Sequence, residues 1–205
     1  NARKSIARGW ASSAIAARSS TAALPKTSDR AMRAARGSGS EPGPRHEHRY
    51  LVALGSNQRL PGTGGPRAVL DAALAALRES GWRVVAVARP IDSAPVGPSL
   101  RRYANGAVLI AGDRDPHATL LDLQRIETAF GRRRRGQRWR SRTLDLDIVL
   151  WSGGTWHRPH LTIPHPLFRD RDFVLRPAAQ IAPHWRDPVT GRTLRQLAAR
   201  HGRQS

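Results

Sequence analysis

The residue pattern over positions 144–150 is the strongest constraint on how this chain can fold. Every second residue is leucine or isoleucine, and Asp145 and Asp147 stand between them. Side chains alternate between the two faces of an extended strand, so the carboxylates share one face, about 6.6–7 Å apart along the strand. The pattern therefore predicts a strand with one face in a core and an acidic opposite face.

An arginine-rich segment leads directly into this strand. Between Gly131 and Asp145 lie arginines at positions 132, 133, 134, 135, 138, 140 and 142, with a second glycine at 136. Two carboxylates that follow such a segment suit divalent cations that are themselves bound to phosphate oxygens. A glycine-flanked loop can also fold onto a polyphosphate and release it. The alternative explanation of residues 144–150 is an exposed strand face with solvated aspartates.

The charge of the chain indicates an anionic partner. The net charge is +20, and residues 1–48 hold nine Lys and Arg against three Asp and Glu, which leaves +14 for residues 49–205. Such a balance is typical of proteins that bind nucleic acid, nucleotides or other phosphate-rich ligands. Every cation after residue 48 is arginine, whose planar group suits bidentate phosphate contacts. A GC-rich genome that encodes arginine in place of lysine also explains part of this bias.

Two parts of the chain differ in composition. Residues 1–48 are rich in Ala, Arg, Ser, Gly and Pro without a sustained apolar period, which predicts a disordered basic extension before a domain at 49–205. An acid-poor, Arg- and Ser-rich leader also resembles an organellar transit peptide. The chain has no cysteine and no apolar run long enough to cross a bilayer. We expect a cytoplasmic protein, or an organellar one if the leader is a transit peptide.

The order of elements predicts an α+β fold. Apolar runs predict strands over 50–54, 83–88, 103–111 and 144–150, and a helical stripe runs from Val69 to Leu77. Asp115-Pro116 is typical of a helix start, here of a helix that ends at Phe130. The order β-α-β-β-α-β predicts a ferredoxin-like sandwich, with an antiparallel sheet, two helices on one sheet face and the other face free for a ligand.

Five pieces of the sequence resemble, in order and spacing along the chain, the signature of the 6-hydroxymethyl-7,8-dihydropterin pyrophosphokinases. These enzymes of the folate pathway transfer pyrophosphate from ATP to a pterin. The most specific piece is Arg138-Trp139-x-x-Arg142-Thr143-Leu144-Asp145-Leu146-Asp147. The resemblance extends over residues 49–186 and includes Gly55-Ser56-Asn57, Pro95-Val96-Gly97 with Tyr103-x-Asn105, Gln124-x-x-Glu127, and Leu161-Thr162-x-Pro164-His165 with Arg171 and Phe173.

The resemblance implies a role for each matching residue. Asp145 and Asp147 would hold two Mg2+ ions on ATP, the co-substrate. Contacts with adenine and ribose are implied for Leu120, Gln124, Glu127, Ile148 and Thr162. Phosphate contacts are implied for Arg132, Arg134, Arg138, Arg142, His165 and Arg171, of which Arg132, Arg134 and Arg142 are also catalytic candidates. The pterin would stack between Tyr103 and Phe173, with its polar edge read by Asn105, Ser93, Ala94, Pro95 and Val96, and Trp139 would close over both substrates.

Two other classes of function remain open at this point. A basic nucleic-acid-binding module would explain the charge and exposed aromatics, but it leaves Asp145 and Asp147 repelling the ligand. A Mg2+-dependent nuclease would use the aspartates but explains neither Tyr103-x-Asn105 nor the segment around His165. We therefore expect a monomer that acts on ATP and hydroxymethyl-dihydropterin without a nucleic acid or membrane partner.

Overall fold

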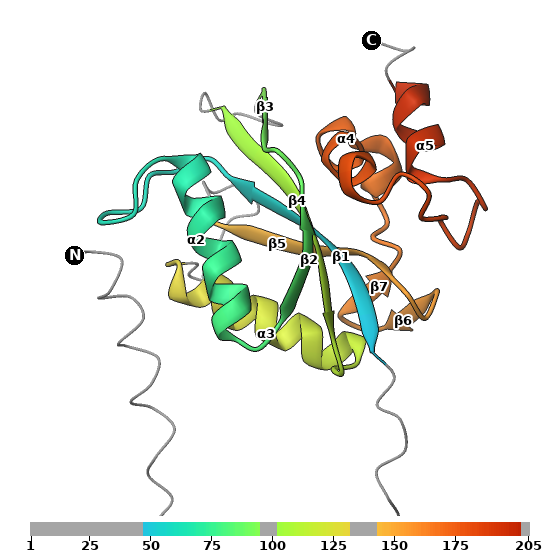
Figure 1. The fold of residues 1–205 in the computed structure, drawn as a ribbon, viewed down its shortest axis with the longest axis horizontal. Helices are drawn as coiled ribbons and strands as arrows, with labels where there is room; N and C mark the ends of the chain where they lie inside the picture. Colours follow the sequence, from blue (N-terminus) through green and yellow to red (C-terminus); the bar gives the residue numbers. More distant parts are fainter. Residues whose placement is uncertain (1–46, 95–101, 132–142, 202–205) are drawn as a thin grey trace, which may run out of the picture. The chain divides into compact units, whose positions relative to one another are not determined.

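The computed structural model describes residues 47–94, 102–131 and 143–201. Most of the predicted N-terminal extension and the arginine-rich segment 132–142 lie outside these ranges. In chain order the elements are β1 (His48–Ser56), α2 (Pro66–Glu79), β2 (Arg83–Val87), β3 (Ile91–Ser93), β4 (Tyr103–Gly112), α3 (Pro116–Ala129), β5 (Asp145–Trp151), β6 (Trp156–Arg158), β7 (Leu161–Ile163), the short 3-10 helix η1 (Phe168–Asp170), α4 (Asp172–Ile181) and α5 (Leu194–His201) (Figure 1).

The main sheet is antiparallel, as the sequence predicts. Its strands follow the order β2-β4-β1-β5, with the short β3 also paired to β4. The two longest strands are β1 and β4, and the whole of β1 pairs with β4, from His48 opposite Gly112 to Ser56 opposite Ala104. Strand β5 lies at one edge of the sheet, and β6 and β7 form a separate hairpin. Strand β1 begins at His48, one residue before the predicted domain boundary.

Helices α2 and α3 cover one face of this sheet. Their buried residues pack with the alternate residues Tyr50, Val52 and Leu54 of β1 in the first hydrophobic cluster. The predicted start of α3 is confirmed, because Asp115 accepts a hydrogen bond from the Ala118 N–H at 2.7 Å. Capping of this kind satisfies an amide that the helix itself leaves without a partner.

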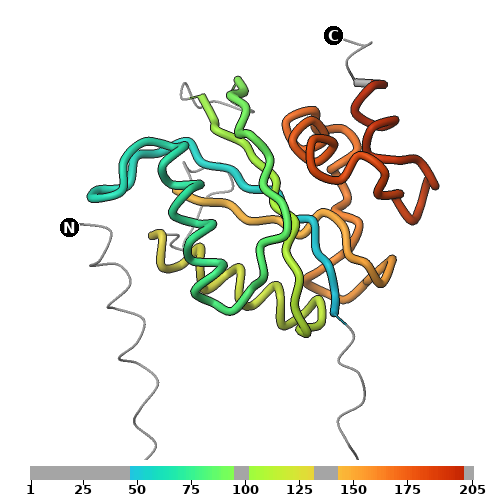
Figure 2. Tube along the Cα trace, viewed as in Figure 1, coloured from blue at the N-terminus to red at the C-terminus, as the bar shows by residue number. Residues whose placement is uncertain are grey.

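Helices α4 and α5 cover much of the opposite face, which the sequence predicted to be free. Figure 2 shows them, in orange and red, on the side of the sheet away from α2 and α3. Leu175, Ala178 and Leu194 pack there with Leu51 and Ala107 of the sheet in a second cluster. The prediction was wrong for this part of the face, because residues 174, 175 and 178 have the spacing of one apolar helix face, which needs a sheet to pack on.

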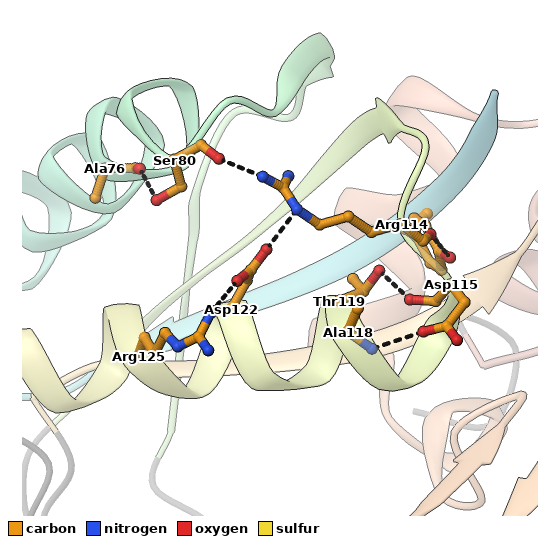
Figure 3. A network of polar contacts seen from close by, with 9 residues as sticks. Ala76, Ser80, Arg114, Asp115, Ala118, Thr119, Asp122 and Arg125 are labelled. Carbon is orange, nitrogen blue, oxygen red and sulfur yellow. Dashed lines mark hydrogen bonds and ion pairs between the residues drawn. The ribbon is translucent and has the colours of Figure 1, made fainter. Parts of the chain in front are cut away.

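A polar network closes the end of the first cluster (Figure 3). The Arg114 guanidinium donates to the Ser80 carbonyl after α2 at 3.0 Å and pairs with Asp122 of α3 at 2.9 Å. The same guanidinium lies over the Trp82 ring, 4.9 Å from its centroid. A side chain at Gly112 would meet that ring at 2.9 Å, so only glycine fits there. Arg114 thereby joins both helices to the end of β4.

Within the described residues, the chain offers no helix that is long and apolar enough to cross a bilayer. The span from Glu47 to Ser205 clusters as one compact unit. The functional residues predicted from the sequence and described by the structure all belong to this unit.

Candidate active site

The centre of the candidate site is a row of three residues across neighbouring strands. Gly55 of β1 is paired with Asn105 of β4 on one side and with Asp145 of β5 on the other. A β-carbon built on Gly55 would lie 3.7 Å from the Asn105 Oδ1 and 3.9 Å from the Asp145 Cβ. The side chains of Asn105 and Asp145 therefore border the same space above Gly55, which has no side chain of its own.

Asp147 continues the site along β5. It is paired with Ala53, two residues before Gly55 on β1, and so shares a sheet face with Asp145. Both aspartates are partly exposed, whereas Leu146 and Ile148 between and after them are buried in the first cluster. The alternation predicted for this strand is therefore confirmed.

The chemistry of the aspartate pair fits a hard divalent cation. Mg2+ prefers oxygen ligands, and in nucleotide sites it commonly takes one or two carboxylates and fills its shell with phosphate and water. The described residues contain no group of three or more His, Cys, Asp and Glu side chains placed to hold a metal ion by themselves. Two carboxylates on one face suit an ion that arrives with a phosphate ligand rather than one held by the protein alone.

His165 lies close enough to the aspartates to respond to their charge. Burial lowers the pKa of its imidazole, and Arg171 lowers it further, against the opposing effects of Asp147 and Asp145. Its Nδ1 accepts a hydrogen bond from the Leu167 N–H at 3.2 Å, so the neutral ring carries its proton on Nε2. The structure thus brings His165, Arg171 and both aspartates, predicted from separate pieces of sequence, to one end of the sheet.

An ion pair between partly exposed Arg169 and a fully buried carboxylate anchors the segment that carries His165 and Arg171. Arg169, between them, donates to both carboxylate oxygens of Asp187 at 2.8 and 2.7 Å. Asp187 has no exposed surface and also accepts hydrogen bonds from the Thr190 hydroxyl and the Val189 N–H. This anchor was not predicted, since a single aspartate outside the matching pieces carries no local signal of its partner.

The predicted pterin residues that the structure describes lie at the same end of the sheet. The Asn105 Nδ2 donates to the Ser93 Oγ at 2.8 Å, and Ser93 of β3 is paired with Tyr103 of β4. Phe173 of α4 packs against the second cluster, with the Arg171 guanidinium 5.8 Å from its ring centroid. Ala94 is exposed after β3. Pro95 and Val96 lie outside the described residues, as do Arg132, Arg134, Arg138, Trp139 and Arg142.

The predicted adenine and ribose residues differ widely in exposure. Gln124 lines a surface pocket of about 330 Å³ on α3 together with Leu121, Arg125 and Thr128. Leu120 packs partly against the first cluster. The Ile148 side chain is buried in that cluster, so any nucleotide contact of this residue falls to its main chain. Glu127 is also buried, and its Oε1 accepts the Leu146 N–H at 2.9 Å.

Thr162 has a partner, His157, that the resemblance does not include. The hairpin of β6 and β7 pairs Thr162 with His157, and the Thr162 Oγ1 lies 3.2 Å from the His157 Nδ1. The spacing of the hairpin could have indicated this pair, because residues that face each other across two antiparallel strands contact through their side chains.

Comparisons with known proteins show which family this chain resembles. Residues 51–183 match the family model described as 7,8-dihydro-6-hydroxymethylpterin-pyrophosphokinase (HPPK). A 2-amino-4-hydroxy-6-hydroxymethyldihydropteridine pyrophosphokinase of Synechocystis sp. is 38% identical over 158 residues, which cover 75% of this chain and 76% of the relative. A protein of the same name from Pseudomonas aeruginosa is 41% identical over 153 residues, or 74% of this chain and 90% of the relative.

A solved structure extends the similarity to the fold. The crystal structure of Plasmodium falciparum HPPK-DHPS with pteroate matches with a TM-score of 0.59 at 13% identity, over 76% of this chain and 42% of that chain. The present chain therefore spans less than half of the solved chain. Because the family match covers well over half of the sequence and two relatives exceed 30% identity, this chain belongs to the 7,8-dihydro-6-hydroxymethylpterin-pyrophosphokinase family.

Proposed function

We propose that this chain transfers pyrophosphate from ATP to the hydroxymethyl group of 6-hydroxymethyl-7,8-dihydropterin. The products are AMP and the pterin diphosphate, and the reaction is a step of folate biosynthesis. The observation that carries the proposal is the row of Asn105, Gly55 and Asp145, in which an amide suited to a heterocycle faces a carboxylate suited to a phosphate-bound cation.

The amide of Asn105 is oriented for a pterin edge. Its Nδ2 is engaged by Ser93, which leaves its Oδ1 toward the space above Gly55. A pterin presents an amino group and a ring N–H on one edge, and both are donors that need acceptors. Asn105 therefore accepts from this edge while Tyr103 and Phe173 hold the ring faces by stacking.

The aspartates would hold Mg2+ on the phosphates of ATP. Asp145 and Asp147 are the proposed ligands, and two ions are expected, as the family resemblance implies. When bound, the metal would neutralise phosphate charge. The hydroxymethyl oxygen attacks the β-phosphorus, the bond from this phosphorus to the α,β-bridging oxygen breaks, AMP leaves with that oxygen, and the hydroxymethyl proton is released to solvent. The chain itself aligns the two substrates, and no nucleophilic side chain takes part.

Side chains that donate hydrogen bonds, most of them cationic, hold the phosphates. His165 donates its Nε2–H, and Arg171 contributes a charge from the first residue before α4. Arg132, Arg134, Arg138 and Arg142 complete the set, with Trp139 closing over both substrates. Leu120, Gln124, Glu127, Ile148 and Thr162 serve the adenine and ribose.

The proposed family function also bears on the fold, the domain boundary, the localisation and the oligomeric state of the chain. The strand order β2-β4-β1-β5 and the two helices on one face support a ferredoxin-like core for the chain. We place the domain at 49–205 after a basic extension that lies almost wholly outside the described residues, and expect a cytoplasmic monomer without a nucleic acid or membrane partner. The similarity of the chain to bacterial pyrophosphokinases supports this setting.

A product analysis tests the proposed reaction. Protein, ATP, Mg2+ and 6-hydroxymethyl-7,8-dihydropterin are mixed, and the phosphorus products are identified by 31P NMR. Equal amounts of AMP and pterin diphosphate are expected, whereas ADP and a pterin monophosphate would show transfer of a single phosphoryl group. A single-stranded oligonucleotide that bound tightly without Mg2+, in a sample with no pterin product, would favour the nucleic-acid module instead.

A further inference from the structure

Glu127 occupies an unusual place for a residue expected at a ligand surface. It lies in the last turn of α3 with only 1% of its surface exposed. Its Oε1 accepts a hydrogen bond from the Leu146 N–H at 2.9 Å. Burial of a carboxylate is costly unless hydrogen bonds compensate it, and a bond from a backbone amide to a charged oxygen is stronger than a neutral one.

The amide that Glu127 accepts from belongs to an edge strand. Strand β5 pairs with β1 alone in the main sheet. In an antiparallel pair, the amides of one strand point alternately toward the neighbour and away from it, so at an edge every second amide needs another partner. Leu146 finds this partner in Glu127, 19 residues earlier in the sequence.

Leu146 is the residue between the two aspartates. Its side chain is 4% exposed in the first cluster, while Asp145 and Asp147 are paired with Gly55 and Ala53 of β1. The backbone that carries the carboxylates is therefore held by β1, by the core and by the end of α3. Ligands of a metal ion must be placed within fractions of an ångström, and groups that hold the ligands strongly affect metal affinity.

We propose that Glu127 is a positioning residue for the Asp145 and Asp147 pair, acting through the Leu146 amide. The inference rests on the proposed function, because it assigns those carboxylates to the metal on ATP. It differs from the role that the family resemblance implies, in which Glu127 contacts the nucleotide directly. It also links α3, which ends at Ala129, with the strand that carries the metal ligands.

Two substitutions of Glu127 separate the effect of losing the hydrogen-bond acceptor for the Leu146 amide from the effect of losing the carboxyl group. Glu127→Gln keeps a carbonyl oxygen for the Leu146 amide, and Glu127→Leu removes it at similar volume. Thr119→Val is the matched control, since Thr119 is equally buried on the same helix but donates to the Asp115 carbonyl at the opposite end. Mn2+ affinity is measured by EPR in the presence of α,β-methylene-ATP, and exchange of the Leu146 amide is followed by NMR.

The expected result is a graded response. Glu127→Leu should weaken Mn2+ binding about 10–100-fold, as loss of a group that orients metal ligands does elsewhere, and should speed exchange of the Leu146 amide. Glu127→Gln should restore most of both properties. Thr119→Val should lower the melting temperature and leave Mn2+ affinity unchanged. Should Glu127→Leu fail to fold, Glu127→Gln still decides, because loss of Mn2+ affinity with the amide still protected would overturn the proposal.

A direct contact with ATP gives a different outcome. If Glu127 met the ribose, Glu127→Gln would weaken ATP binding but would have little effect on 2′,3′-dideoxy-ATP, with Mn2+ affinity unchanged. That result would also overturn the proposal. Failure of the proposed function is recognised separately, since a wild-type protein that forms no pterin diphosphate still allows both the Mn2+ and the exchange measurements.

Discussion

Asn105 and Asp145 lie opposite the same residue, Gly55, from strands on either side of β1. One belongs to the proposed pterin site and the other to the proposed metal site. The two sites are therefore adjacent across a single backbone position. A reaction that joins a pterin oxygen to a metal-bound phosphate needs this closeness, because holding the reacting groups together removes much of the entropic barrier.

The first prediction concerns the missing side chain at this position. An alanine at Gly55 would meet Asn105 and Asp145 at ordinary contact distances of 3.7 and 3.9 Å, so the fold should accept it. Its methyl group would nevertheless fill the space between the proposed pterin site and the proposed metal site. We expect Gly55→Ala to raise the KM for the pterin at least about tenfold, equivalent to roughly 1.4 kcal/mol, with the melting temperature nearly unchanged.

Gly106→Ala is the control for this variant. A β-carbon at Gly106 would lie 3.6 Å from the Leu70 Cδ1, at a similar distance but on the α2 side of the sheet. Pterin binding by isothermal calorimetry should be unaffected by this change. Equal losses in both variants would mean that the sheet, rather than the site, had been disturbed.

The second prediction concerns the aspartates themselves. Asp145→Asn or Asp147→Asn removes a charge that a bound dication requires, so turnover should fall by at least about a hundredfold. The melting temperature should change little, because asparagine has the shape of aspartate and both side chains are partly exposed. Asp71→Asn on the exposed surface of α2 should leave turnover unchanged. Normal Mg2+-dependent activity in either site variant would exclude the proposed metal ligands.

The third prediction concerns the ion pair of Asp187 and Arg169. Burial would raise the pKa of the Asp187 carboxyl, but hydrogen bonds from Arg169, Thr190 and the Val189 N–H outweigh it and lower the pKa. Asp187→Ala removes two hydrogen bonds from Arg169 and takes the acceptor away from the Thr190 hydroxyl and the Val189 N–H, so it should cost at least about 2 kcal/mol of unfolding free energy. Asp172→Asn, which loses an exposed pair with Arg176 at 3.5 Å, should cost about 0.5 kcal/mol or less.

The same pair gives a pH dependence of known sign. A carboxyl with a lowered folded-state pKa binds fewer protons in the folded chain than in the unfolded chain. Its stabilisation is therefore complete above the unfolded pKa, about 3.9, and is lost as the pH falls through the folded value. Urea unfolding between pH 6 and pH 3 should show a steeper loss of stability for the wild type than for Asp187→Asn. Parallel curves would contradict the assignment.

The fourth prediction concerns the stability of the fold at alkaline pH. Burial raises the pKa of Tyr50 to about 12, with a smaller contribution from Asp115 and an opposing one from a hydrogen bond with Thr119. The folded chain then holds this proton more tightly than the unfolded chain, so the stabilisation is complete below about pH 10 and falls as the pH rises toward 12. Unfolding free energies measured from pH 8 to pH 11 should decline more steeply for the wild type than for Tyr50→Phe.

The fifth prediction concerns the start of the domain. Glu47 pairs with Arg83 of β2 at 2.6 Å, so a deletion of residues 1–46 keeps every contact of β1 described above. We expect this deletion to leave pyrophosphokinase activity and the melting temperature nearly unchanged. A deletion that continues through Tyr50 removes a fully buried residue and should unfold the protein. A large loss of activity in the shorter deletion would contradict the predicted boundary.

Local patterns predicted the four main strands and the helices α2 and α3, whereas the site residues follow from the family resemblance and stay predictions. The alternation around Asp145 and Asp147 fixed a strand and its two faces, and Asp115 marked the start of α3, because both signals depend on neighbours in sequence. Residues that act through distant partners gave no such signal. Glu127 accepts from an amide 19 residues away, and the pairing of Arg169 with Asp187 depends on how the C-terminal turn returns to η1. Only the folded chain brings these groups together.

The buried carboxylate of Asp187 also affects where the working protein ends. The family match stops at residue 183, four residues before this anchor, and α5 begins only at Leu194. A recombinant fragment trimmed to the family match would keep His165 and Arg171 but would lose the carboxylate that fixes the segment between them. Such a fragment would contain every residue of the sequence signature, but the segment with His165 and Arg171 would lack its anchor. Fragments for expression and for inhibitor screening should therefore extend beyond α5.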